Sequence, residues 1–393
     1  MTNQKILNYF TFMQAAALLM LLTSIVPAAQ KVSADQTANQ TVALKAKMLT
    51  LKTDQIDEIV NISTFLRNNR GDVFLFSPTR GKIFKFKPDG TFEKRFCRFG
   101  EGPGEIARVF HMFHNPINDF LYLPEYVSKR GKITVYDSIG KFQGFMNVEL
   151  SNSQKDHVSE ILFLNDGSFY ISTNERVNWK PQGKFFITQD EYKIEYFDKD
   201  GHLLAEIFRT ILDDELSNAV RWGGPQIFFK PSILTALTPE GNIALAKNDE
   251  NTFSIYNRQG KVIETVTLEI NRIKLSDGRF NKNREMTLED WKGKTDERML
   301  YLVKHMIKLN FEPIYSNFFL TENKIILSKP YERDDYGYVK KSKLLFFDKK
   351  GKKKTEKIID GKVINIQKNS LFIVFFDSEG NEHFRIEEGT LDI

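Results

Sequence analysis

The chain has 393 residues, of which 13% are aromatic and 27% charged, and its formal net charge is +5. This composition is typical of a folded, strand-rich protein and excludes a disordered chain. The excess of 56 basic over 51 acidic residues is too small and too scattered for a nucleic-acid-binding protein. The single cysteine, Cys97, excludes an intrachain disulfide, and we expect a small apolar side chain rather than a nucleophile.

The first 34 residues have the pattern of a signal peptide. Lys5 precedes an apolar run from Ala15 to Val26, which is short for a membrane span, and small residues follow it. We expect residues 35–45 to form a flexible leader. The pattern predicts an exported protein, periplasmic or extracellular, with no membrane span in the mature chain. An uncleaved N-terminal anchor is the alternative.

One strand-and-turn unit recurs along the rest of the chain. A strand of aromatic and β-branched residues ends in a four-residue turn closed by glycine, because the turn needs a positive φ. Asp or Asn at the start of most of these turns can accept hydrogen bonds from the turn amides. The turns are Lys87–Gly90, Asp137–Gly140, Asp198–Gly201, Asn257–Gly260, Asp348–Gly351 and a sixth at Asp377–Gly380.

Two more apolar strands precede each of the first five hairpins, so the repeat is a meander of four strands, A to D. Its turn glycines lie 50, 61, 59 and 91 residues apart, which is the spacing of propeller blades with insertions. The last unit lacks strand D, and the unpaired segment Met48–Leu51 can supply it. We therefore predict an all-β fold over residues 46–393, a six-bladed β-propeller of four-stranded antiparallel blades. A pair of β-sandwiches is the alternative.

Residues 286–309 break the strand pattern, because their apolar residues recur at helical spacing. We predict a helical insertion there that covers a blade edge, or alternatively forms a lid over the mouth of the central channel.

Loop lengths differ between the two faces of the predicted ring. The A–B and C–D turns are tight, whereas the long excursions, 173–190, 208–232, 271–314 and 329–342, all leave from the opposite face. Functional side chains concentrate on long loops held by a rigid scaffold. The candidate ligand-binding residues, chosen because aromatic and charged groups suit sugars or peptides, are Trp179, Arg221, Trp222, Tyr331, Arg333, Asp335 and Tyr336.

No catalytic constellation stands out. His111 and His114 would point to opposite faces of a strand, so a shared metal is not expected, and Asp334–Asp335 reads as a solvated turn rather than a calcium site. The basic run Lys349–Lys354 is expected to be a solvated hairpin tip. We predict a non-enzymatic binding module for a glycan or a peptide, without cofactor or metal and without nucleic acid, as a monomer. A channel-metal hydrolase or lactonase, or a lyase, is the alternative, and a scaffold without a small ligand is a third.

The segment Phe99–Ile106 (FGEGPGEI) resembles the linker of NHL-repeat propellers, and Trp222–Ile227 is a degenerate copy. The chain is most similar to Bacteroidetes-type exported six-bladed propellers related to NHL proteins. The resemblance implies a structural linker role for Gly100, Gly102, Pro103 and Gly104. It transfers no activity, because that class includes scaffolds, glycan or peptide binders, lyases and lactonases.

Overall fold

The computed structural model describes residues 47–51, 59, 62–125, 132–151, 157–182, 185–212, 233–248, 250–271, 317–333, 339–367, 370–376 and 382–388. The predicted signal peptide, leader, helical insertion and sixth turn lie outside these residues. Within them, no helix is long and apolar enough to cross a membrane.

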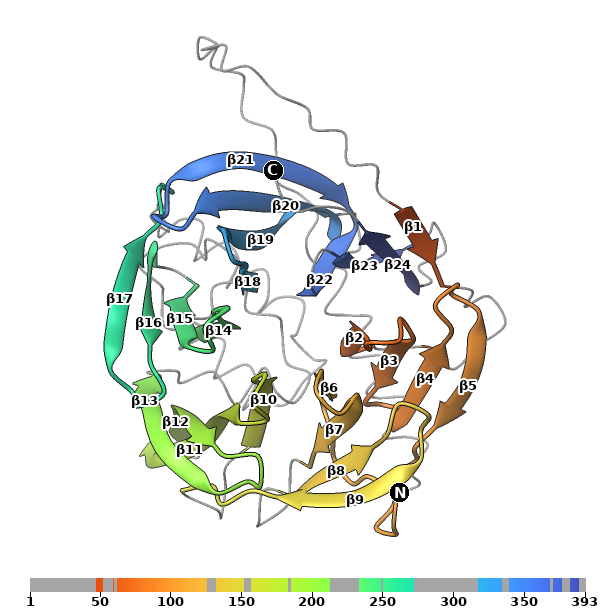
Figure 1. Ribbon diagram of the computed structural model, residues 1–393. Coiled ribbons are helices and arrows are strands. Elements are labelled where there is room, and N and C mark those ends of the chain that lie inside the picture. Colours follow the sequence, from red (N-terminus) through yellow and green to blue (C-terminus); the bar gives the residue numbers. More distant parts are fainter. Residues whose placement is uncertain are drawn as a thin grey trace.

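Six four-stranded antiparallel sheets stand around one axis, as predicted (Figure 1). Blade 1 is β2 (Thr64–Arg67), β3 (Val73–Ser77), β4 (Lys82–Phe86) and β5 (Phe92–Phe96); blade 2 is β6 (Phe113–Asn115), β7 (Phe120–Pro124), β8 (Lys132–Tyr136) and β9 (Phe142–Asn147). Blade 3 is β10 (His157–Phe163), β11 (Phe169–Gln182), β12 (Phe185–Phe197) and β13 (Leu203–Leu212). Blade 4 is β14 (Ile233–Leu237), β15 (Ile243–Lys247), β16 (Thr252–Tyr256) and β17 (Val262–Thr267).

Blade 5 is β18 (Asn317–Leu320), β19 (Lys324–Arg333), β20 (Val339–Asp348) and β21 (Lys353–Asp360). Blade 6 combines β22 (Lys362–Gln367), β23 (Ser370–Phe376) and β24 (Glu382–Glu388) with β1 (Lys47–Thr50) from the other end of the chain. In each blade the first strand lies nearest the axis and the last strand forms the rim (Figure 1).

The ring closes through β1, and the predicted pairing is confirmed. Leu49 lies opposite Ile386, Thr50 lies opposite Arg385, and the Leu51 amide donates to the Phe384 carbonyl. This pairing covers the otherwise open edge of β24, which an incomplete blade would leave exposed.

The core consists of six separate apolar clusters, one between each pair of neighbouring blades. Alternate residues of a strand face opposite neighbours, so both faces of each blade are apolar. On β12, for example, Phe197 packs toward blade 2, whereas Ile194 and Tyr196 pack toward blade 4.

The C–D turns are built as the sequence predicted. In blade 5 the Gly351 amide donates to the Asp348 carbonyl, and Asp348 Oδ1 accepts from the amides of Lys350 and Lys352. Gly351 has φ +81°, and a Cβ there would lie 2.0 Å from the carbonyl oxygen of Thr267 in the rim strand of blade 4. Glycine is therefore required both by the turn and by the packing of neighbouring blades.

Candidate functional site

The two faces of the ring differ in the same sense as predicted. A–B and C–D turns leave from one face, here called the tight-turn face, and are closed by short-range hydrogen bonds such as Gly71 N to Asn68 O and Gly201 N to Asp198 O. The other face, here called the long-excursion face, carries the B–C and D–A connections.

Two of the predicted long loops are β-hairpins. Strands β11 and β12 stay paired as far as Gln182 opposite Phe185, and β19 and β20 stay paired as far as Arg333 opposite Val339. The corresponding strands of blades 1, 2 and 4 have five residues each. The sequence interpretation of these segments as loops was therefore wrong: the blade sheets of blades 3 and 5 continue beyond the ring. The two D–A excursions are described only up to Leu212 and residue 271.

The structure places part of the predicted ligand-binding set. Tyr331 lies on the β19–β20 hairpin and is 52% exposed. The Nζ of Lys343 lies 4.7 Å from the centre of the Tyr331 ring and 2.9 Å from Glu356 Oε1. Hydrogen bonds from Lys343 and then Lys353 lower the pKa of Glu356 to about 2, so this hairpin presents an aromatic ring beside fixed charges.

For two other predicted residues, the structure describes only the backbone. Trp179 belongs to β11 and Arg333 is the last residue of β19. Arg221, Trp222, Asp335 and Tyr336 lie outside the described residues, so their convergence on one site stays a prediction.

At the long-excursion end, polar side chains join the inner strands of neighbouring blades. The Met112 amide donates to Thr64 Oγ1 at 3.1 Å, Asn317 Nδ2 donates to the Val363 carbonyl at 3.2 Å, and Thr235 Oγ1 donates to Glu160 Oε2. These bonds join the inner strands of blades 1 and 2, of blades 5 and 6, and of blades 3 and 4, respectively.

Glu160 is the single carboxylate on the six inner strands as the structure describes them. It is only partly exposed, and burial raises its pKa to about 7 against the weaker, opposite effect of the Thr235 hydrogen bond. A carboxyl that titrates near neutral pH beside the axis is a functional candidate that the sequence did not single out. Its only sequence signal is an acid inside an otherwise apolar strand.

Aromatic side chains and a histidine adjoin the same end of β6. Phe110 is 49% exposed, and the ring of His111 lies 6.4 Å from that of Phe113. Desolvation lowers the pKa of His111, so its imidazole is neutral at physiological pH. His114, in contrast, bonds Asp119 at 2.9 Å beside the tight turn, so the two histidines make separate contacts.

Of the residues described, Asp198, Asp200 and His202 are the one acidic and histidine group close enough to share a metal ion. They lie on the exposed C–D turn of blade 3. Asp198 Oδ1 accepts from the amides of Asp200 and His202, and its Oδ2 contacts His202 Nδ1. Turn closure accounts for this arrangement without a metal.

Cys97 follows the end of β5 with φ +72° and contacts the apolar cluster between blades 1 and 2. Burial raises the pKa of its thiol to about 11. The thiol is therefore protonated at neutral pH, which opposes a nucleophilic role.

The glycine linker forms a compact loop between β5 and β6. Gly102 N donates to Glu105 Oε2 at 2.9 Å, Gly100 N donates to the Ile106 carbonyl, and Tyr136 of blade 2 donates to the Gly104 carbonyl. A Cβ on Gly100 would lie 1.8 Å from Glu105 Oε2. The first two bonds close the loop, and the Tyr136 bond holds it to blade 2; Pro103 lies in the same loop.

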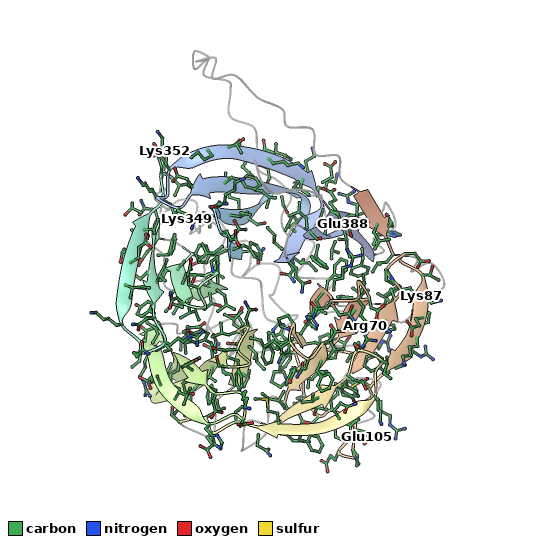
Figure 2. All side chains as sticks on the ribbon, in the orientation of Figure 1. Arg70, Lys87, Glu105, Lys349, Lys352 and Glu388 are labelled. Atoms are coloured by element: carbon green, nitrogen blue, oxygen red, sulfur yellow. The ribbon has the colours of Figure 1, made fainter. Side chains whose placement is uncertain are left out.

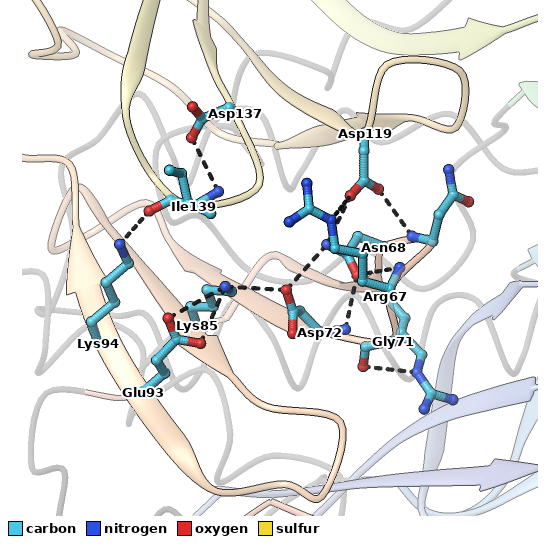
Figure 3. Close-up of polar contacts among 12 residues, drawn as sticks. Arg67, Asn68, Gly71, Asp72, Lys85, Glu93, Lys94, Asp119, Asp137 and Ile139 are labelled. Carbon is cyan, nitrogen blue, oxygen red and sulfur yellow. Dashed lines mark hydrogen bonds and ion pairs between the residues drawn. The ribbon is translucent and has the colours of Figure 1, made fainter.

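The tight-turn face is held by a polar network between blades 1 and 2 (Figure 3). Lys85 is buried and pairs with Asp72 and Glu93, each at 3.1 Å, while Asn68 donates to Asp72 and to Asp119 of blade 2. The polar groups of this network are therefore paired with one another, which leaves few of them for a ligand.

The basic run of blade 5 lies on the rim, where Lys349 and Lys352 are labelled (Figure 2). Lys353 pairs with Glu356 at 2.8 Å, and Lys354 pairs with Asp348 at 2.9 Å. Part of its charge is therefore compensated within the blade.

Comparison with known proteins supports the fold. Residues 27–207 match a family model described as a 6-bladed beta-propeller. A protein from Bacteroides fragilis described as exported is similar at 12% identity and a TM-score of 0.53, covering 90% of this chain and 97% of its own. A DUF4221 family member from Bacteroides vulgatus is similar at 12% identity and a TM-score of 0.54, covering 88% and 97%.

The chain is thus a six-bladed β-propeller, as the repeats predicted, and it is similar in structure to these two Bacteroides proteins, one of them described as exported. Virginiamycin B lyase from Staphylococcus aureus is also similar, at 9% identity and a TM-score of 0.40 over 87% of this chain and 99% of its own, a likeness too low to carry an argument about activity. No curated protein matches the sequence.

Proposed function

We propose that this protein is an exported, non-enzymatic binding module that holds a glycan or a peptide on its long-excursion face. The observation that carries the proposal is the extension of two blades into hairpins on that face, one of which presents the exposed ring of Tyr331. On the tight-turn face, the described connections are short turns closed by their own hydrogen bonds, and its polar groups join blades 1 and 2. Binding surfaces are commonly built from such extensions of a rigid scaffold.

Export is part of the same proposal. It is supported by the signal-peptide pattern of residues 1–34 and by the similarity to a protein described as exported. The alternative function, a channel-metal hydrolase or lyase, requires several metal ligands around the axis. Metal analysis of the purified protein, with activity assays on lactones, tests that alternative.

The proposal is tested by trimming the blade 3 hairpin. Asn174 lies opposite Tyr192, so residues 175–191 can be replaced by Asn-Gly, which closes a two-residue hairpin between paired positions. Glycan and peptide arrays identify a ligand for the unmodified chain, and titration gives its affinity. We expect trimming, or Tyr331→Ala, to weaken binding at least about tenfold.

A double variant on the tight turn of blade 3, Lys199→Ala with Asp200→Ala, is the matched control. It should bind like the unmodified chain, and circular dichroism should show that all variants keep the sheet content. Undiminished binding by both hairpin variants, or loss of binding in the control alone, would refute the proposal.

A further inference from the structure

Four side chains from four strands meet at the inner end of the interface between blades 3 and 4. Glu160 of β10 lies directly opposite Ser172 of β11, and Tyr192 of β12 is diagonal to Ser172 across the β11–β12 pair. Thr235 of β14 donates to Glu160 from the neighbouring blade. We call Glu160, Ser172, Tyr192 and Thr235 the Glu160 cluster.

A β-bulge sets the position of Glu160. The register of β10 against β11 shifts between Val158 and Glu160, and the extra residue, Ser159, bonds the Ser172 carbonyl at 3.0 Å. The side chains that follow on the same side of β10, Leu162 and Leu164, belong to the interface with blade 4. Bulges of this kind re-aim side chains and are frequent beside functional sites.

The cluster contains unused hydrogen-bonding capacity. Among the described residues no Lys, Arg or His pairs with Glu160, and the Thr235 hydroxyl is its one hydrogen-bond partner. Ser172 is 1% exposed, and its Oγ has no hydrogen-bond partner in the described part of the chain. The side chain of Ser172 is close enough to the Tyr192 hydroxyl to lower the pKa of Tyr192. The two groups do not, however, have the geometry of a hydrogen bond. Buried polar groups without partners call for an explanation, such as an absent ligand.

We propose that the Glu160 cluster binds a primary ammonium group, the side chain of a lysine or the amino terminus of a peptide. An ammonium has three donors and a positive charge. Glu160 supplies the opposite charge and an acceptor, Ser172 Oγ supplies a second acceptor, and Tyr192 supplies its hydroxyl oxygen or its ring. This inference rests on the proposed function and narrows it to peptides that carry a free amine.

The location supports the assignment. Ser172 and Tyr192 lie where the β11–β12 hairpin leaves the ring, so a peptide along the hairpin would reach the cluster. A neutral sugar would offer hydroxyls to the same oxygens but no positive charge, and the described residues place no counter-charge beside the carboxyl.

Binding of an amine should depend on pH through Glu160. Burial raises the pKa of Glu160 to about 7, and a bound cation would lower it, so binding releases a proton below that pH. Tyr192 is the other titratable group of the cluster, and burial and then the charge of Glu160 keep its pKa far above this range. Affinity should therefore rise about 30-fold from pH 5.5 to pH 8 and then level off.

The probe is N-acetyl-lysine methylamide, titrated into the full chain and followed by isothermal calorimetry or methyl NMR at pH 5.5 and 8. N-acetyl-norleucine methylamide, which lacks the amine, and methyl glucoside are the comparison ligands. The lysine probe should bind with the stated pH dependence, and the comparison ligands should bind at least tenfold more weakly.

Glu160→Gln should abolish the pH dependence and weaken binding of the lysine probe at least tenfold at pH 8. Ser172→Ala, which keeps the charge, should weaken it several-fold. Glu149→Gln, at an exposed carboxylate whose backbone amide donates to Gly201 in the C–D turn of blade 3, should leave it unchanged. The inference is overturned if the lysine probe does not bind, if Glu160→Gln binds it equally well, or if norleucine or the glucoside binds as tightly.

Failure here is separable from failure of the proposed function. Array ligands that bind through the hairpins while the lysine probe does not would refute the ammonium site alone. Array binding that survives hairpin trimming would refute the binding face itself.

Discussion

At the scale of single residues, the Glu160 carboxyl lowers the stability of the folded chain near neutral pH and leaves a charge that a ligand can pair with. This partly buried carboxyl has one hydroxyl partner and no counter-charge among the described residues, so folding favours its protonated form. Lys85, by comparison, is buried but pairs with Asp72 and Glu93, each at 3.1 Å, so its charge is compensated. An uncompensated group is better explained by a ligand than by folding.

A pH series on Glu160→Gln measures this cost. The folded-state pKa of about 7 lies above the ordinary value of 4.5, so the native state binds more protons between these values. Its stability should fall as the pH rises through that window, by on the order of 3 kcal/mol, and Gln should remove the fall. Urea unfolding at pH 4.5, 6 and 8 gives the two curves, with Glu149→Gln as control. A difference between parent and variant that stays constant with pH would exclude a raised pKa.

The residues of the turns were predictable from the sequence, because their chemistry is local. Asp137, Asn257 and Asp348 bond the amides two and four residues ahead, as the turn pattern predicted. Glu160 was not predictable, because its environment comes from Thr235, 75 residues away, and from the bulge that aims it.

At the scale of elements, β1 has the same relation to its neighbour as the other rim strands. A Cβ on Gly90 would lie 2.8 Å from the Thr50 carbonyl oxygen, just as one on Gly201 would lie 2.7 Å from that of Asn147. The strand from the N-terminal end therefore completes blade 6 as a true rim strand. Its apolar residues and the missing fourth strand of the last unit were sufficient to predict the pairing.

Leu51 tests the contribution of this strand. It is 2% exposed and packs in the cluster between blades 6 and 1. Leu51→Ala should cost about 2–4 kcal/mol of unfolding free energy, because it leaves a cavity at the closure. Leu204→Ala, at a position 56% exposed, should cost less than about 0.5 kcal/mol. Equal, small losses in urea unfolding would show that β1 does not close the ring in solution.

The long hairpins were the elements that sequence reasoning missed. Residues 174–191 mix polar and charged side chains with Val177, Trp179 and the apolar run 185–187, without one regular alternation along the segment, so the sequence shows no single buried face. They are strands because each lies beside its partner in register, from Asn174 opposite Tyr192 to Gln182 opposite Phe185. Pairing that depends on a partner strand rather than on a buried face is weakly specified by composition.

At the scale of the whole molecule, the two faces of the ring differ in their connections: tight turns on one face, and two blades extended into hairpins on the other. The number of blades, their order and the place of closure followed from the repeat, since each depends on a pattern that recurs. The occupant of the long-excursion face did not follow, because fold and spacing do not determine what a surface binds.

Hydrogen exchange with and without the tightest array ligand tests the central claim most directly. Amides of the β11–β12 and β19–β20 hairpins and of β10 should gain protection on binding, because the ligand covers them. Amides of the tight turns, such as those at Gly90, Gly201 and Gly351, should exchange as before. Protection confined to those turns, with the hairpins unchanged, would contradict a ligand site on the long-excursion face.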